Sequence, residues 1–205
     1  SGEENVFRMM AYIRKYLFED PTAPIPLEPI KMPFDGIYSL VNNQVYYDIS
    51  SFLEAQDKKF DIYVGMLSHR SSWLNQNLQV ESSLVEALNQ INIGVIPVFS
   101  SGEKSEIVQS YDFEEIVEHY FSINGQLFIQ GLINFQMHLI KAQNGLSIAE
   151  NSVRLFQKID IPVFHPISSY FTDLAKWKEN VNPLAMELQS AYLNPEMAGM
   201  IEPVL

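Results

Sequence analysis

Residues 61–102 read DIYVGMLSHRSSWLNQNLQVESSLVEALNQINIGVIPVFSSG, and this stretch decides the fold. It opens with a short apolar run, Ile62 to Leu67, and closes near a second one, Val95 to Phe99. Between them, apolar residues recur at helical spacing from Leu78 to Ile91. A strand, a helix and a strand in this order predict a right-handed βαβ unit whose two strands are parallel.

The composition indicates a soluble chain with one hydrophobic core. The 205 residues are 47% hydrophobic, which is enough for one domain or for one domain with an appendage. No apolar run approaches the roughly 20 residues that cross a bilayer. The formal net charge of −12 repels nucleic-acid phosphates and anionic membranes. The absence of cysteine excludes disulfides and thiolate metal sites. We expect a cytoplasmic protein that binds neither nucleic acid nor a membrane.

Residues 1–60 are predicted to form an appendage to a domain of residues 61–205. Apolar residues between Val6 and Leu17 fall on one face of an amphipathic helix. A turn, a short extended piece and a short helix over residues 35–56 end this appendage, which is expected to pack on the core or on absent domains. Within the appendage, between the first helix and residue 35, an extended spacer is imposed by five prolines: Pro21, Pro24, Pro26, Pro29 and Pro33.

The remainder of the chain continues the alternation of helices and strands. Asp112 followed by Glu115 is a capping-box pattern, which predicts the start of a helix. Five strands alternating with helices predict an α/β fold with an open five-stranded parallel sheet, flavodoxin-like and wound on both faces. Beyond the βαβ unit, strands are expected at residues 131–136, 161–167 and 200–205, and helices at residues 148–159 and 171–193.

The motifs of common nucleotide-binding and hydrolytic sites do not occur. The turn after the first strand, residues 65–73, lacks the glycines of a dinucleotide site. GxxxxGK[ST], HExxH and GxSxG are also absent. No nucleophile, base and orienting group occur together, so a complete active site is not expected within this chain. If the system uses ATP, another chain should bind it.

Polar and aromatic side chains at the predicted carboxyl ends of the strands are the candidate ligand contacts. His69 and Arg70 follow the first strand, where they either reach a cleft or solvate a loop. Trp73 either offers a stacking surface to a planar ligand or covers the core. His138 and His165 either point into the same cleft, toward a ligand or metal, or are buried and hydrogen-bonded. The remaining histidine lies among glutamates on a predicted helix, which indicates a solvent-facing position.

Segments spread along the whole chain form a recognisable series. After the N-terminal helix and Pro-rich spacer come FDGIY (34–38), VGMLSHRSSWL (64–74), VIPVFSSG (95–102) and IDIPVFHPIS (159–168), then Trp177, Pro183, Pro195-Glu196 and Gly199 before MIEPV. In order and spacing, this series resembles the large subunit of cobalt chelatase and the H subunit of magnesium chelatase. Those subunits are several times longer, so the resemblance implies a piece of the N-terminal part of such a subunit.

The resemblance implies a subunit that holds a tetrapyrrole and an incoming metal ion. AAA+ ATPase partner subunits would hydrolyse ATP and drive insertion. Insertion of Co²⁺ into hydrogenobyrinic acid a,c-diamide, on the route to cobalamin, is expected ahead of Mg²⁺ insertion into protoporphyrin. The chain would then be part of a multi-subunit ligase and inactive alone. It would bind no cofactor itself, and no catalytic residue or metal ligand is assigned.

The chain departs from the family pattern in three places. The family commonly has Arg, any residue, His after the first strand, and this chain has Arg70 and Ser72 there. The family's Asp before the Gly of the last segment is Ala198 here, and Gln136-Met137-His138 replaces a Gly-containing segment after the third strand. These departures keep open a second hypothesis, a non-catalytic ligand-binding or interaction domain derived from the family. The ligand-binding candidates are His69, Arg70, Ser72, Trp73, His138 and His165.

Overall fold

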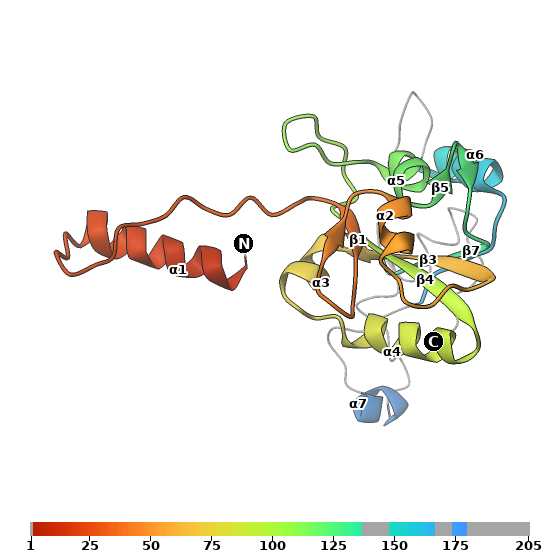
Figure 1. Cartoon of the computed structure of the whole chain (residues 1–205), viewed down its shortest axis with the longest axis horizontal. Helices are drawn as coiled ribbons and strands as arrows, with labels where there is room; N and C mark the ends of the chain where they lie inside the picture. Colours follow the sequence, from red (N-terminus) through yellow and green to blue (C-terminus); the bar gives the residue numbers. More distant parts are fainter. Residues whose placement is uncertain (1, 137–147, 167–173, 180–205) are drawn as a thin grey trace.

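A mixed sheet forms the centre of the protein. The computed structural model describes residues 2–136, 148–166 and 174–179 (Figure 1). The β3–β4, β3–β7 and β7–β8 pairs are parallel, whereas β1 pairs antiparallel with both of its neighbours. In spatial order the six strands are β2 (Val45–Tyr46), β1 (Gly36–Tyr38), β4 (Ile93–Ser100), β3 (Ile62–His69), β7 (Gly131–Asn134) and β8 (Val163–Phe164).

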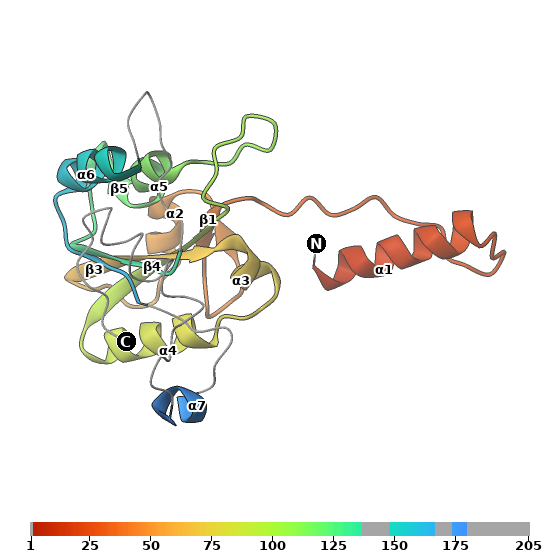
Figure 2. The same ribbon diagram turned by 180° about the vertical axis from the view of Figure 1, so that it is seen from behind.

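Helices cover both faces of this sheet (Figures 1 and 2). One face carries α5 (Phe113–Tyr120) and α6 (Ile148–Ile159), and the other carries α4 (Gln79–Gln90). The short helix α3 (Arg70–Leu74) follows β3 directly. The remaining elements of the domain are α2 (Ile49–Glu54), the separate ribbon of β5 (Ser122–Ile123) and β6 (Gln126–Leu127), and α7 (Leu174–Glu179).

The core consists of one apolar cluster on each face of the sheet. Leu67 belongs to the cluster under α5, with Ile116 and Phe121, whereas its neighbour Met66 belongs to the cluster under α4. Successive side chains of a strand point to opposite faces, so the continuous apolar run of β3 supplies both clusters. The central strands are therefore buried on both sides, as expected for parallel strands between helical layers.

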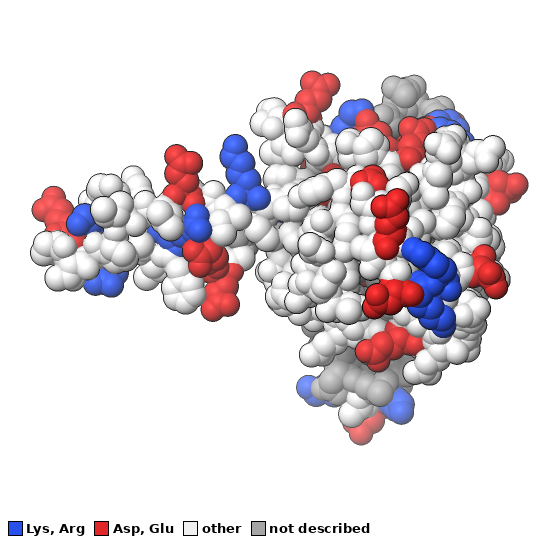
Figure 3. Space-filling model, viewed as in Figure 1, with Lys and Arg blue, Asp and Glu red and all other residues white. Residues whose placement is uncertain are grey.

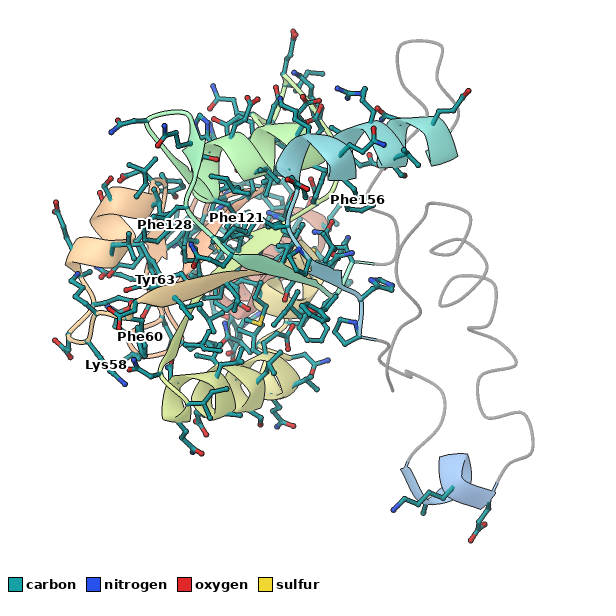
Figure 4. All side chains as sticks on the ribbon, turned by 90° about the vertical axis from the view of Figure 1, so that its right-hand side faces the viewer. Lys58, Phe60, Tyr63, Phe121, Phe128 and Phe156 are labelled. Atoms are coloured by element: carbon teal, nitrogen blue, oxygen red, sulfur yellow. The ribbon has the colours of Figure 1, made fainter. Side chains whose placement is uncertain are left out.

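Aromatic side chains pack along the start of β3 (Figure 4). The Phe60 and Tyr63 rings meet edge to face with centroids 5.8 Å apart, and the Tyr63 and Phe128 centroids are 5.2 Å apart. Lys58 makes a cation–π contact at the end of this aromatic series, with its Nζ 4.5 Å from the Phe60 ring centroid. A Cβ atom on Gly94 would lie 2.5 Å from Cε1 of Tyr63. A side chain at this position would therefore displace the Tyr63 ring.

The N-terminal extension is fastened to the spacer. It contains α1 (Glu3–Tyr12) and the π-helical turn η1 (Ile13–Leu17), neither of which has a buried residue. The Asn5 amide bonds in both directions with the Ile30 backbone, at 2.8 and 2.7 Å. Arg8 bonds to the Glu28 carbonyl and, at 2.9 Å, to Glu4. The extension stands out from the domain (Figure 1), and these polar contacts attach it to the spacer.

The predicted α/β class and the βαβ unit are confirmed. The sheet has six described strands, and the prediction of five parallel strands missed the antiparallel β1 and β2 at the β4 edge. The capping box at Asp112 and Glu115 is present. The strand predicted at residues 200–205 and most of the helix predicted at residues 171–193 lie outside the described residues. Within the described part of the chain, no helix has both the length and the apolar character needed to cross a bilayer.

Candidate functional site

The predicted ligand edge of the sheet carries a cleft. β3 ends at His69 and β4 ends at Ser100, which are paired in register. Because β1 is antiparallel to β4, it begins at this same edge, with Gly36 opposite Phe99. A cleft of about 940 Å³ lies here, lined by spacer residues 30–35, by residues 107–109 and by side chains of α5. The position is the one at which α/β sheets present their binding residues.

Arg70 is held firmly at the wall of this cleft. Its Nε donates to the Pro33 carbonyl at 2.7 Å and its Nη2 donates to the Met32 carbonyl at 3.1 Å. Its guanidinium carbon lies 4.1 Å from the centroid of the Phe34 ring. These contacts fix the plane of the guanidinium and attach the spacer to the start of α3. Burial lowers the Arg70 pKa, an effect that the charge of Asp35 opposes.

Asp35 is a buried carboxylate in the same cleft. It is 5% exposed and accepts hydrogen bonds from the Tyr120 hydroxyl at 2.7 Å and the Tyr111 backbone N–H at 2.9 Å. Burial raises the pKa of Asp35, and the two hydrogen bonds oppose the shift. Burial and the neighbouring Asp35 also raise the Tyr120 pKa far above its ordinary value. Tyr120 therefore acts as a hydrogen-bond donor to Asp35.

His119, which the sequence placed on a solvent-facing helix surface, also lines the cleft. Its Nε2 lies 3.0 Å from the Tyr111 hydroxyl, and the two ring centroids are 4.5 Å apart. Glu114 and Glu118 both pair with Lys158, at 2.7 and 3.0 Å. The expected solvent-facing position of His119 is confirmed, because its side chain is exposed. The sequence did not reveal that His119 also borders the cleft.

His69 and Ser72 lie at α3, beside Arg70. The His69 side chain accepts from the Ser71 N–H at 3.2 Å and so caps this helix, with its Nδ1 also 2.7 Å from Ser71 Oγ. Burial and the Arg70 charge lower the His69 pKa. Ser72 is half-buried, and its carbonyl accepts from the Asn77 N–H at 2.9 Å. Neither residue lines the cleft that contains Arg70.

Trp73 packs on the core. Its ring is parallel to that of Phe99, with centroids 4.0 Å apart and planes 3° apart. It belongs to the apolar cluster under α4, together with Tyr38 and Met66. At least one face of the indole is therefore covered by the protein itself.

His165 belongs to a buried polar network beyond β7 and β8. It is 5% exposed, its Nδ1 lies 2.9 Å from the Asn134 carbonyl oxygen, and burial lowers its pKa. The Gln136 side chain donates to the carbonyls of Ser68 and Ser100, at 3.1 and 3.0 Å, and so ties the ends of β3 and β4 together. This position matches the buried, hydrogen-bonded alternative for His165. His138 lies outside the described residues.

The charges of the visible surface are mixed. Figure 3 shows Lys and Arg side chains interspersed with Asp and Glu side chains on the face drawn. Among residues 2–136, 148–166 and 174–179, no group of three or more His, Cys, Asp or Glu side chains is arranged to hold a metal ion. The cleft instead combines a guanidinium, an imidazole, phenols and aromatic faces.

Fold and cleft together define an α/β domain of the kind that binds ligands beyond the carboxyl ends of its parallel strands. The chain belongs to the CobN/magnesium chelatase family, whose sequence model matches residues 1–205.

Two relatives come from Methanocaldococcus jannaschii. The uncharacterized protein MJ1441 is 32% identical over 179 residues, and the uncharacterized protein MJ0908 is 25% identical over 180 residues. These matches cover 86% and 85% of this chain but only 14% of each relative. The chain thus spans about a seventh of the length of the relatives it matches.

The fold is also shared with a solved structure. The catalytic subunit of cobaltochelatase from Mycobacterium tuberculosis matches with a TM-score of 0.61 at 15% identity. The match covers 98% of this chain and 15% of that subunit. At this identity the likeness shows a common fold.

Proposed function

We propose that this chain is a segment of the tetrapyrrole-binding large subunit of an ATP-dependent metal chelatase. The observation that carries the proposal is the family match over residues 1–205. The activity, substrates and partners of a whole subunit belong to the proposal, because the chain spans only 14% of its curated relatives. In this role the segment holds part of the macrocycle and is inactive alone.

The chemistry of metal insertion fits a division of labour among subunits. Two pyrrolic protons leave the ring while the ion sheds its water, so a base and metal-ferrying groups are needed at the macrocycle face. The sequence contains no phosphate-binding loop. We therefore assign ATP hydrolysis to AAA+ partner subunits and the metal-handling groups to other parts of the assembly. The contribution of this segment is the aromatic and cationic cleft around Arg70.

Cobalt is our preferred metal, and hydrogenobyrinic acid a,c-diamide our preferred macrocycle. The preference is supported by the structural neighbour, which is the catalytic subunit of a cobaltochelatase. We further propose a flavodoxin-like winding of the sheet. The parallel strands occur in the order β4-β3-β7-β8, which corresponds to the order 2-1-3-4 of flavodoxin-like sheets.

A second candidate is a non-catalytic ligand-binding domain that retains the family architecture. The observation that favours it is Ser72, which stands where the family commonly has His and which does not line the cleft. Both candidates predict binding of a macrocycle. They differ in whether a longer chain containing this segment supports metal insertion.

The test is a titration of the 205-residue chain with hydrogenobyrinic acid a,c-diamide and with protoporphyrin, followed by absorbance and tryptophan quenching. Saturable binding of the first alone supports the cobalt assignment, and saturable binding of the second alone supports a magnesium chelatase. Absence of binding to either refutes a macrocycle-binding role for this segment. Insertion assays with AAA+ partners and a full-length subunit then separate the two candidates.

A further inference from the structure

We propose that the cleft beside Arg70 is a receptor for the carboxylate-bearing edge of a planar macrocycle. Arg70 donates to a peripheral carboxylate, and the tip formed by Ile107 and Val108 covers the apolar ring. The inference rests on the proposed function for the class of ligand, and it adds a site and a mode of recognition.

The guanidinium of Arg70 is held in a fixed orientation. Two carbonyl groups already accept from Nε and Nη2 of Arg70, and the Phe34 ring supports the guanidinium from 4.1 Å. Within the described part of the chain, no hydrogen-bond acceptor is found for Nη1. A guanidinium held in this way loses little side-chain entropy on binding, and its hydrogen bonds to carboxylates are charge-assisted and directional. The two N–H groups of Nη1 and the second N–H of Nη2 remain for a ligand.

The charges that line the cleft favour an anionic group. The net charge of −12 disfavours anions at long range, yet the cleft itself is different. Asp35 is the acidic side chain among its described lining residues, and both carboxylate oxygens accept hydrogen bonds from the protein. Arg70 and the exposed Lys31 face the same space, so a carboxylate meets a locally cationic wall.

An exposed apolar hairpin tip also lines the cleft. Ser105 and Ser110 exchange backbone hydrogen bonds at 3.1 and 3.0 Å, which closes a hairpin after β4. At its tip, the side chain of Ile107 is 95% exposed, and that of Val108 is 38% exposed. Ile30 and Met32 continue the apolar lining on the spacer side. A ligand with an apolar ring and anionic substituents matches a cleft with one apolar lip and one cationic wall.

The test compares three macrocycles and four proteins. The macrocycles are hydrogenobyrinic acid a,c-diamide, protoporphyrin and protoporphyrin dimethyl ester, and the proteins are the unmodified chain, Arg70→Met, Ile107→Ser and Arg14→Met. We expect Arg70→Met to weaken binding of the free acids by about 10- to 100-fold and binding of the ester far less. Ile107→Ser should weaken acid and ester alike by a few-fold. Arg14→Met is the control, because Arg14 pairs with Asp20 at 2.5 Å on the extension, outside the cleft.

A small probe separates this inference from the proposed function. Naphthalene-2,6-dicarboxylate should shift the Nε–Hε NMR signal of Arg70 in the unmodified chain, and Ile107→Ser should leave that shift in place. A dicarboxylate response without macrocycle binding supports the carboxylate receptor and refutes the proposed function. Macrocycle binding that is equal in the unmodified chain and Arg70→Met overturns the receptor and leaves the proposed function standing. No response to the dicarboxylate and no macrocycle binding overturns both.

Discussion

The Tyr120 hydroxyl donates a 2.7 Å hydrogen bond to Asp35, 85 residues earlier in the chain. Tyr120 is the last residue of α5, and Asp35 directly precedes β1, so the bond joins a covering helix to the edge of the sheet. Both side chains are buried, at 2% and 5% exposure. Asp35 and Tyr120 also line the cleft, so loss of this hydrogen bond should affect both the stability of the protein and the shape of the site.

Tyr120→Phe should destabilise the protein. The substitution keeps the ring but leaves a buried carboxylate oxygen short of a donor, which typically costs about 1–3 kcal/mol. Urea unfolding measures the effect. Tyr111→Phe is the matched control, because the Tyr111 hydroxyl contacts the exposed His119, whereas Asp35 uses the Tyr111 backbone. A loss for Tyr120→Phe no larger than that for Tyr111→Phe would contradict this role.

The pKa of Asp35 should lie above its ordinary value of 3.8, because burial outweighs the two hydrogen bonds. A carboxyl whose pKa is raised by folding binds its proton more tightly in the folded state. Its contribution to stability is therefore greatest below the unfolded pKa and declines as the pH rises through the folded pKa. NMR titration of the Asp35 carboxyl carbon measures the value. Asp20 is the internal contrast, because hydrogen bonds from Thr22 and Arg14 lower its pKa to about 2. An Asp35 pKa at or below 3.8 would refute the assignment.

Gly94→Ala should destabilise the sheet, although alanine usually stabilises a chain relative to glycine. The new methyl group would lie 2.5 Å from the Tyr63 ring and 2.8 Å from the Phe60 ring. Overpacking of this kind costs about 1–3 kcal/mol. Gly131→Ala is the matched control, because its methyl group would meet only ordinary contacts at 3.6 and 3.7 Å. Thermal unfolding of both variants should show a clear loss for the first and little change for the second.

Trp73→Ala should unfold more readily than Trp73→Phe. The alanine variant removes the ring stacked 4.0 Å from Phe99, and we expect a loss of about 2–4 kcal/mol for this partly buried position. The phenylalanine variant retains an aromatic face over Phe99 and should lose about half as much. Denaturant unfolding followed by circular dichroism checks this order. Equal stability of the two variants and the unmodified chain would mean that the stack contributes nothing to the core.

The buried βαβ unit could be predicted from the sequence because its signals are local. The apolar runs of β3 and β4 are each continuous, and α4 between them has clear helical periodicity. Asp112 and Glu115 form a capping box within four residues, and this local pattern likewise predicts the start of α5. In contrast, β1 and β2 comprise three and two residues, too few to show a period. β2 pairs with β1 and β1 pairs with β4, and the β1–β4 pairing is a tertiary contact that no local sequence pattern can reveal.

The site was predicted less completely for the same reason. The position of Arg70 follows from the rule on strand ends, and the structure places it in the cleft. Asp35, Tyr111 and Tyr120 come together over intervals of 76 and 85 residues, so no spacing within the sequence could reveal them. The sequence of α5 does contain one signal. Its capping box fixes the start of the helix, which places Ile116 and Tyr120 on one apolar face. His119 next to Tyr120 is thereby placed at the border of that face.

The hydrogen bonds from Arg70 to Met32 and Pro33 have a practical consequence for dissecting the protein. They make the last residues of the spacer an integral part of the domain, whereas Asn5 and Arg8 attach the extension to Ile30 and Glu28. A cut between these two groups of contacts, just before Met32, breaks none of them. Shortened versions for crystallography or domain exchange should therefore begin there, and those that begin after Phe34 would lose the support of Arg70 along with the extension.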